Sequence, residues 1–157
     1  MDKPEKSSNG SADVNVSDDK IMHGCYVIEL PSDFPNIMIV RLYDEWNTQT
    51  AVSCIEECHQ RALDHFKGRS WGIMADLQQW GLCTPETINY MRTHMFNFIT
   101  IGLKMQAVLP SGLLNKMVAE TMHKEVQPSD FISEYFSNQE QALAWLDKEL
   151  QRYEGSD

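Results

Sequence analysis

Two short, mainly apolar runs constrain the fold of this chain more than any other feature of its sequence. They are WGIMADL at Trp71–Leu77 and KMQAVLP at Lys104–Pro110. Each is shorter than a typical helix and suits a strand that is buried on both faces. A stretch with helical spacing follows each run. Buried strands that alternate with helices form a largely parallel sheet, so an α/β fold is predicted.

The other elements follow from the same periodicities. Between Thr48 and Phe66 the apolar residues recur at steps of three and four, which predicts one buried stripe of a helix. Near the C-terminus, Ser137 and Glu140 have the spacing of a capping box, and Trp145 is expected on the buried face of the helix that they begin. The remaining predicted elements are strands at Cys25–Leu30, Ile37–Tyr43 and Phe131–Phe136, and helices at Pro85–Ile99 and Leu113–Lys124.

This order predicts a four- to five-stranded, mostly parallel sheet with an N-terminal β-hairpin and about four packed helices. Residues 1–20 are rich in Ser, Asp, Lys and Asn and have little to bury, so they are predicted to be a disordered N-terminal tail. Residues 21–153 are predicted to form a single domain. Residues 154–157 are predicted to be a short C-terminal tail.

The charge balance disfavours two classes of partner. The chain has 23 acidic and 13 basic residues and a net charge of −10. Nucleic acids and anionic membrane surfaces both require clustered Lys and Arg. No apolar run reaches the roughly 18 residues of a membrane span. The start of the chain does not resemble a secretory signal, so the four cysteines are expected to be reduced thiols in the cytoplasm.

Cys54 and Cys58 are one helical turn apart, and two thiolates at that spacing could grip a soft metal. A structural zinc site needs four ligands, however, and no second pair is present. Cys58 also lies on the apolar stripe, which favours the interpretation that both cysteines are small core residues rather than metal ligands. Asp44 and Glu45 are adjacent carboxylates, but no other polar group of the sequence points at them. We therefore expect no metal, no cofactor and no catalytic residue.

The stretch after Trp71–Leu77 is the predicted binding site. Asp76 is expected to end the central strand, and ligands of α/β proteins bind off the carboxyl ends of strands. Gln78, Trp80, Cys83 and Thr84 follow in a predicted loop, with Thr84 as a helix N-cap. These side chains could hold a small molecule or a partner. Alternatively, Asp76 hydrogen-bonds the loop and Trp80 covers the edge of the sheet.

Methionines suggest a second part of that site. Met91 and Met95 lie on the predicted helix after the loop, and methionine adapts to irregular apolar ligands. A groove that they line could accept an acyl chain or a partner helix. Their helical spacing favours core packing over such a groove.

Two stretches carry a resemblance to a known family. MADL closes the central strand, and EYFSNQEQALAWL (134–146) closes the chain. With the order of elements from Met22 to Leu150, they resemble the SpoIIAA-like branch of the STAS superfamily, the domains related to anti-sigma-factor antagonists and to the tails of sulfate transporters. The resemblance implies a non-catalytic domain. Signalling members bind a partner kinase, which phosphorylates a serine at the start of the helix after the central strand. Here Thr84, followed by proline, stands in the comparable position.

These observations predict a non-catalytic regulatory or protein-interaction domain with a protein partner. The alternative is a carrier or sensor of a small apolar or amphipathic ligand, held near the loop after the central strand and the Met-rich helices.

Overall fold

The computed structural model describes residues 22–112 and 131–154. The predicted N-terminal tail, the predicted helix at Leu113–Lys124 and most of the predicted C-terminal tail lie outside these residues. The elements of the described part are β1 (Cys25–Glu29), β2 (Ile37–Trp46), α1 (Thr48–Phe66), β3 (Trp71–Cys83), α2 (Pro85–Thr100), β4 (Leu103–Leu109), β5 (Ile132–Tyr135) and α4 (Gln139–Glu154).

The strands form one sheet whose spatial order equals the order in the chain, β1-β2-β3-β4-β5. β1 and β2 pair antiparallel and form the predicted hairpin, whereas the other three neighbouring pairs are parallel. The sheet is therefore mixed. α1 connects β2 to β3, and α2 connects β3 to β4. Both crossovers move in the same direction along the sheet, so a common hand places α1 and α2 on the same face.

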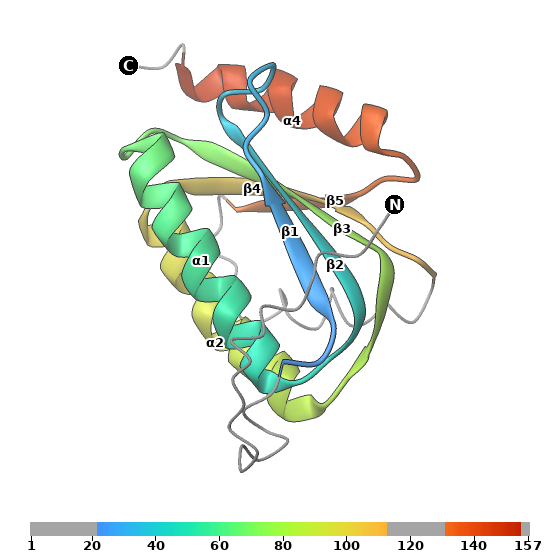
Figure 1. The fold of residues 1–157 in the computed structure, drawn as a ribbon. Coiled ribbons are helices and arrows are strands. Elements are labelled where there is room, and N and C mark those ends of the chain that lie inside the picture. The colour runs from blue at the N-terminus through green and yellow to red at the C-terminus, as the bar shows by residue number, and fades with distance from the viewer. Residues whose placement is uncertain (1–21, 113–130, 155–157) are drawn as a thin grey trace.

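Helices cover both faces of the sheet, with α1 and α2 on one side and α4 on the other (Figure 1). Alternate residues of β2 supply the two cores, because Met38 and Val40 face α1 and α2 while Ile37 and Ile39 face α4. Under α1 and α2, the ring of Trp71 stacks on Phe66 with centroids 4.8 Å apart. None of the helices in residues 22–112 and 131–154 is long and apolar enough to cross a bilayer.

β2 and β3 are longer than their sequence patterns predict. The loop predicted directly after Leu77 is wrong, because β3 continues to Cys83 alongside an extended β2. Two register shifts interrupt this pairing, between Arg41 and Tyr43 and between Asp44 and Trp46. At these irregularities the apolar residues no longer alternate strictly. β4 accompanies β3 only as far as Asp76, so the distal half of β3 pairs with β2.

The terminal helix begins one residue later than a capping box at Ser137 requires. Asn138 is the capping residue, since its Oδ1 accepts a hydrogen bond of 2.9 Å from the backbone N–H of Gln141. Asn is as good an N-cap as Ser. Trp145 is half-buried and packs against Phe136 at 5.4 Å, so the prediction that it lies on the buried face holds only in part. The buried side chains of α4 are Ala142, Leu143, Leu146 and Leu150.

Candidate functional site

Asp76 lies inside β3 and faces the side of the sheet that α4 covers. It is opposite Arg41 of β2, and its Oδ2 is 2.7 Å from the Nη1 of that arginine. Its other oxygen accepts a hydrogen bond of 3.1 Å from the backbone N–H of Gln78. Only 13% of the Asp76 side chain and 18% of the Arg41 side chain are exposed. The Asp76 carboxylate is thus engaged on both oxygens.

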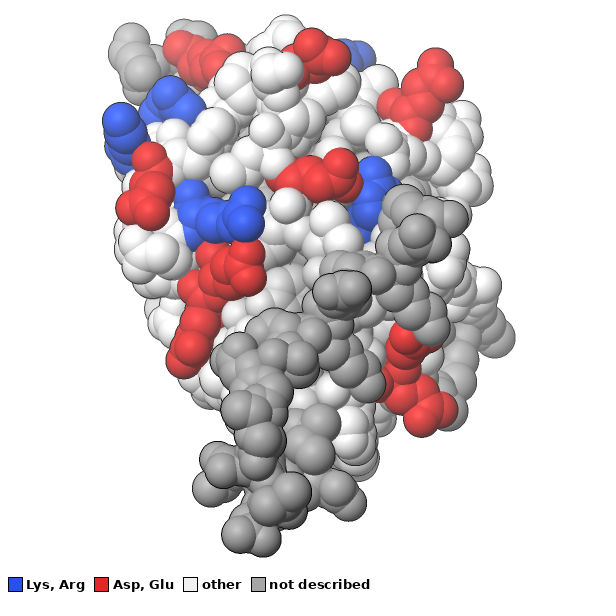
Figure 2. Space-filling model, viewed as in Figure 1, with Lys and Arg blue, Asp and Glu red and all other residues white. Residues whose placement is uncertain are grey.

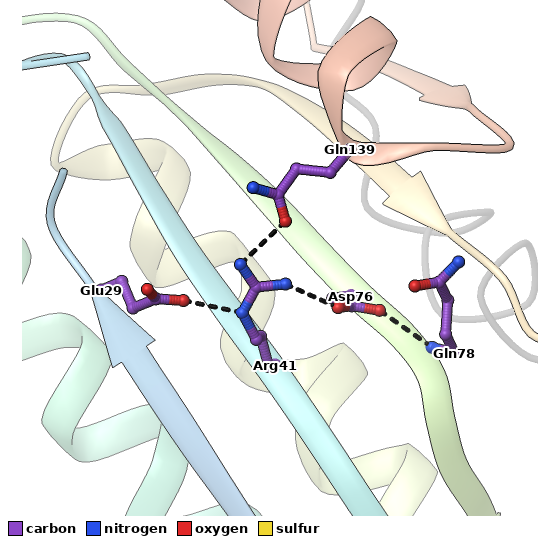
Figure 3. Close-up of polar contacts among 5 residues, drawn as sticks. All are labelled: Glu29, Arg41, Asp76, Gln78 and Gln139. Carbon is purple, nitrogen blue, oxygen red and sulfur yellow. Dashed lines mark hydrogen bonds and ion pairs between the residues drawn. The ribbon is translucent and has the colours of Figure 1, made fainter. Parts of the chain in front are cut away.

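Arg41 makes Asp76 part of a larger network (Figure 3). Its Nε donates to Glu29 of β1 at 2.7 Å, and its Nη2 donates to Gln139 of α4 at 2.8 Å. Burial alone would lower the pKa of the guanidinium, but the hydrogen bonds and charges of Glu29 and Asp76 outweigh burial and raise that pKa above its ordinary value. The network ties three strands to the first residue of α4.

Trp80 belongs to the opposite face of the sheet. It is 4% exposed and meets Trp46 edge to face, with ring centroids 5.7 Å apart. Trp46 packs in the same way on Tyr26, at 6.1 Å. This geometry is typical of aromatic residues inside a core. The absence of a side chain at Gly81 allows β2 and β3 to approach closely at this point. A Cβ at that position would lie only 2.9 Å from the Cγ of Glu45.

Cys83 ends β3, and Thr84 caps α2 as predicted. Burial raises the pKa of the Cys83 thiol to about 11, so the thiol stays protonated and weakly nucleophilic at neutral pH. Thr84 is exposed, and its Oγ1 accepts a hydrogen bond of 3.2 Å from the backbone N–H of Thr87. The fully buried hydroxyl of Thr87 lies 3.0 Å from that of Thr84 and 3.1 Å from that of Thr48. These threonines join the N-terminal ends of α1 and α2.

Met91 and Met95 are half-buried and pack on the core beneath α1 and α2. Trp80 contributes to that same core, whereas Asp76 faces α4. The predicted site residues therefore divide between the two faces of the sheet and do not line one pocket. Among the exposed apolar side chains, Phe96 of α2 is 49% exposed.

Cys54 and Cys58 are core residues, with 4% and 2% of their surfaces exposed. Their Sγ atoms are 4.0 Å apart, and the contact with Cys58, together with burial, raises the pKa of the Cys54 thiol well above its ordinary value. Within residues 22–112 and 131–154, no group of three or more His, Cys, Asp or Glu side chains is arranged to hold a metal ion.

Sequence comparisons match the chain neither to a protein-family profile nor to a curated protein. Structural comparison does give a match, to an uncharacterized protein from the DUF3478 family with a SpoIIAA-like fold from Shewanella loihica PV-4. The two structures superpose with a TM-score of 0.57 over 80% of this chain and 95% of the other. The fold is SpoIIAA-like. At 15% sequence identity the match shows the fold alone.

In this SpoIIAA-like fold, the hydroxyl at the start of the helix after the central strand is that of Thr84. Sequence reasoning missed the partners of Asp76. Arg41 is the single charged residue in the predicted strand Ile37–Tyr43, and a cation in such a strand signals a carboxylate partner. Only the strand register shows that this partner is Asp76.

Proposed function

We propose that the protein is a non-catalytic interaction domain whose partner contacts the end of the molecule where β3 runs into α2. The observation that carries the proposal is the position of Thr84, an exposed residue at the N-cap of α2, beside the start of α1. A partner surface can contact this exposed residue without any change in the core. A phosphate on Thr84 would also meet the positive end of the α2 dipole.

The surroundings of Thr84 suggest the chemistry of the partner. Glu86 is exposed in the first turn of α2, and Glu45 is exposed on the neighbouring strand, with its Cγ next to Gly81. Both carboxylates project from a protein with a net charge of −10. A partner surface rich in Lys or Arg complements this end of the domain and would be steered towards it.

We favour this function over an enzyme and over an apolar carrier for separate reasons. The Asp76 carboxylate is engaged by Arg41 and Gln78, and the Cys83 thiol is protonated at neutral pH, so neither is poised for acid–base or nucleophilic chemistry. Trp80 and Met91, which would hold an apolar chain in a carrier, pack on the core beneath α1 and α2.

Photo-crosslinking in the native cells tests the proposal. A photoreactive amino acid replaces Glu86 in one variant and Lys148 in the control variant. Both positions are exposed, but Lys148 lies on α4, in the opposite layer. We expect a discrete crosslinked protein from position 86 and none from position 148, and we expect Glu45→Lys to weaken the crosslink. The same products from both positions, or none from position 86, would overturn the proposal.

A further inference from the structure

A cleft of about 550 Å³ opens at the far end of the molecule from Thr84. Its lining consists of the turn from Lys67 to Ser70, together with Asn36, Tyr153 and Glu154. The turn joins α1 to β3, Asn36 precedes β2, and the other two residues end α4. In the view of Figure 1 the turn after α1 and the end of α4 lie at the upper left. The volume is within the range of natural small-molecule sites.

Two cations form one wall of the cleft. Lys67 and Arg69 are both exposed, and neither forms an ion pair within residues 22–112 and 131–154. Arg69 uses one Nη2 contact of 3.4 Å to the carbonyl oxygen of His65, which leaves most of its five N–H donors available. Figure 2 shows Lys and Arg side chains gathered at this upper left corner, over the end of α1.

The opposite wall provides hydrogen-bonding groups and an aromatic ring. Glu154 Oε1 accepts a hydrogen bond of 2.6 Å from Asn36 Nδ2, so each side chain is held in place and keeps a second polar atom for a ligand. Behind this wall, the Nζ of Lys104 lies 5.7 Å from the centroid of the Tyr153 ring. Among the described residues that line the cleft, Lys67 and Arg69 are the cations and Glu154 is the carboxylate, and Lys104 adds a positive charge behind Tyr153.

We propose that this cleft binds a small phosphomonoester that also carries hydroxyl groups. Arg69 and Lys67 would hold the phosphate, because a guanidinium matches its oxygens and an ammonium adds a point charge. Ser70, Asn36 and Glu154 would hydrogen-bond the hydroxyls, and the carbon skeleton would pack on Tyr153. This polar site is separate from the Thr84 surface, so either assignment stands or falls without the other.

Titration of the full ¹⁵N-labelled chain by NMR tests the site with defined probes. The probes are glycerol 3-phosphate, inorganic phosphate and glycerol. We expect glycerol 3-phosphate to shift the amide signals of Gly68 and Ser70 and to bind more tightly than inorganic phosphate, and we expect glycerol alone to shift nothing. Equal affinity for the two anions would overturn the hydroxyl part of the proposal, and unshifted signals in the 67–70 turn would overturn the whole.

Charge-removing variants locate the binding. Lys67 adopts a left-handed conformation with φ 51°, which Asn tolerates, so Lys67→Asn removes the charge and leaves the turn intact. Combined with Arg69→Gln, it should weaken glycerol 3-phosphate binding at least about ten-fold, since each lost contact is charge-assisted. The control is Arg61→Gln on the exposed side of α1, where Arg61 already pairs with Glu57, and it should bind as the unaltered chain does. Equal losses in both variants would mean nonspecific charge attraction and would overturn the site.

Discussion

Replacing Asp76 with asparagine removes a charge from the Arg41 network and keeps the shape of the side chain. Exposed ion pairs contribute up to about 1 kcal/mol to the free energy of unfolding, and breaking a buried pair costs about 3–5 kcal/mol. With 13% and 18% of its two side chains exposed, the pair lies between these limits. Glu29 and Gln139 also remain on Arg41 after the change. We therefore expect Asp76→Asn to lower the free energy of unfolding by about 2 kcal/mol, or Tm by about 8 °C.

Urea denaturation followed by tryptophan fluorescence measures this loss. The matched control is Glu57→Gln, which breaks the exposed Arg61–Glu57 pair, where 45% and 40% of the side chains are exposed, and it should cost less than about 0.5 kcal/mol. The double variant Arg41→Met/Asp76→Leu should lose less free energy of unfolding than the summed losses of Arg41→Met and Asp76→Leu. The reason is that it leaves no buried charge unpaired. A loss for Asp76→Asn no larger than that of the control, or additive single losses, would refute the reasoning.

Three further predictions concern single residues. Trp80→Ala should lower the free energy of unfolding by about 3–5 kcal/mol in the same denaturation assay, because Trp80 is a core residue; a loss below about 1 kcal/mol would mean that it lies in a surface loop. Gly102→Ala should lower Tm far more than Gly68→Ala. Both glycines have positive φ, but a Cβ at Gly102 would lie 2.5 Å from the carbonyl oxygen of Arg69, whereas a Cβ at Gly68 would meet open space. Equal shifts of Tm for the two alanine variants would contradict that difference. Alkylation of Cys83, followed by mass spectrometry, should accelerate from pH 9 up to about pH 11, and a plateau near pH 9 would show an ordinary thiol. Because the folded pKa is raised, the unfolded chain loses this proton first, so the contribution of Cys83 to stability should decline as pH rises from about 9 to about 11.

Most of the fold can be predicted from the regular spacing of apolar residues in the sequence. The apolar stripe of α1 gave its bounds, Thr48–Phe66, and Thr84 followed by Pro85 gave the start of α2. These signals are local, since spacing and capping depend on neighbours within one or two turns. The composition of β1 and β2 likewise indicates the N-terminal hairpin, because two short strand-forming stretches flank a loop rich in turn residues.

The distal half of β3 could not be predicted from the sequence, because its pairing partner β2 is distant in the chain. Gln78, Gln79 and Gly81 have the composition of a loop, and Leu77 and Trp80 are three positions apart rather than two. The register shifts in the pairing with β2 restore both apolar residues to the same core. Such an irregularity is set by the partner strand, which a single-strand pattern does not contain.

The candidate sites show the same division. Thr84 was found from a local cap signal, and the structure places it as that signal requires. The cleft at Lys67–Ser70 unites a turn, a residue before β2 and the end of α4, and its members are up to 118 positions apart, as in the bond between Asn36 and Glu154. Sequence spacing gives no warning of such a meeting.

Because each strand pairs with the next one in the chain, the sheet can be assembled in the order of synthesis. β1 to β4 and the two helices α1 and α2 supply most of the core on one face, to which Phe131 and Tyr135 are added later, whereas the apolar side chains of Ile37 and Met74 await α4. A nascent chain whose synthesis stops before Gln139 would expose that second face of the sheet. Such a chain would be a target for chaperones and prone to aggregation. Synthesis of α4 is thus the event that covers the second face of the sheet.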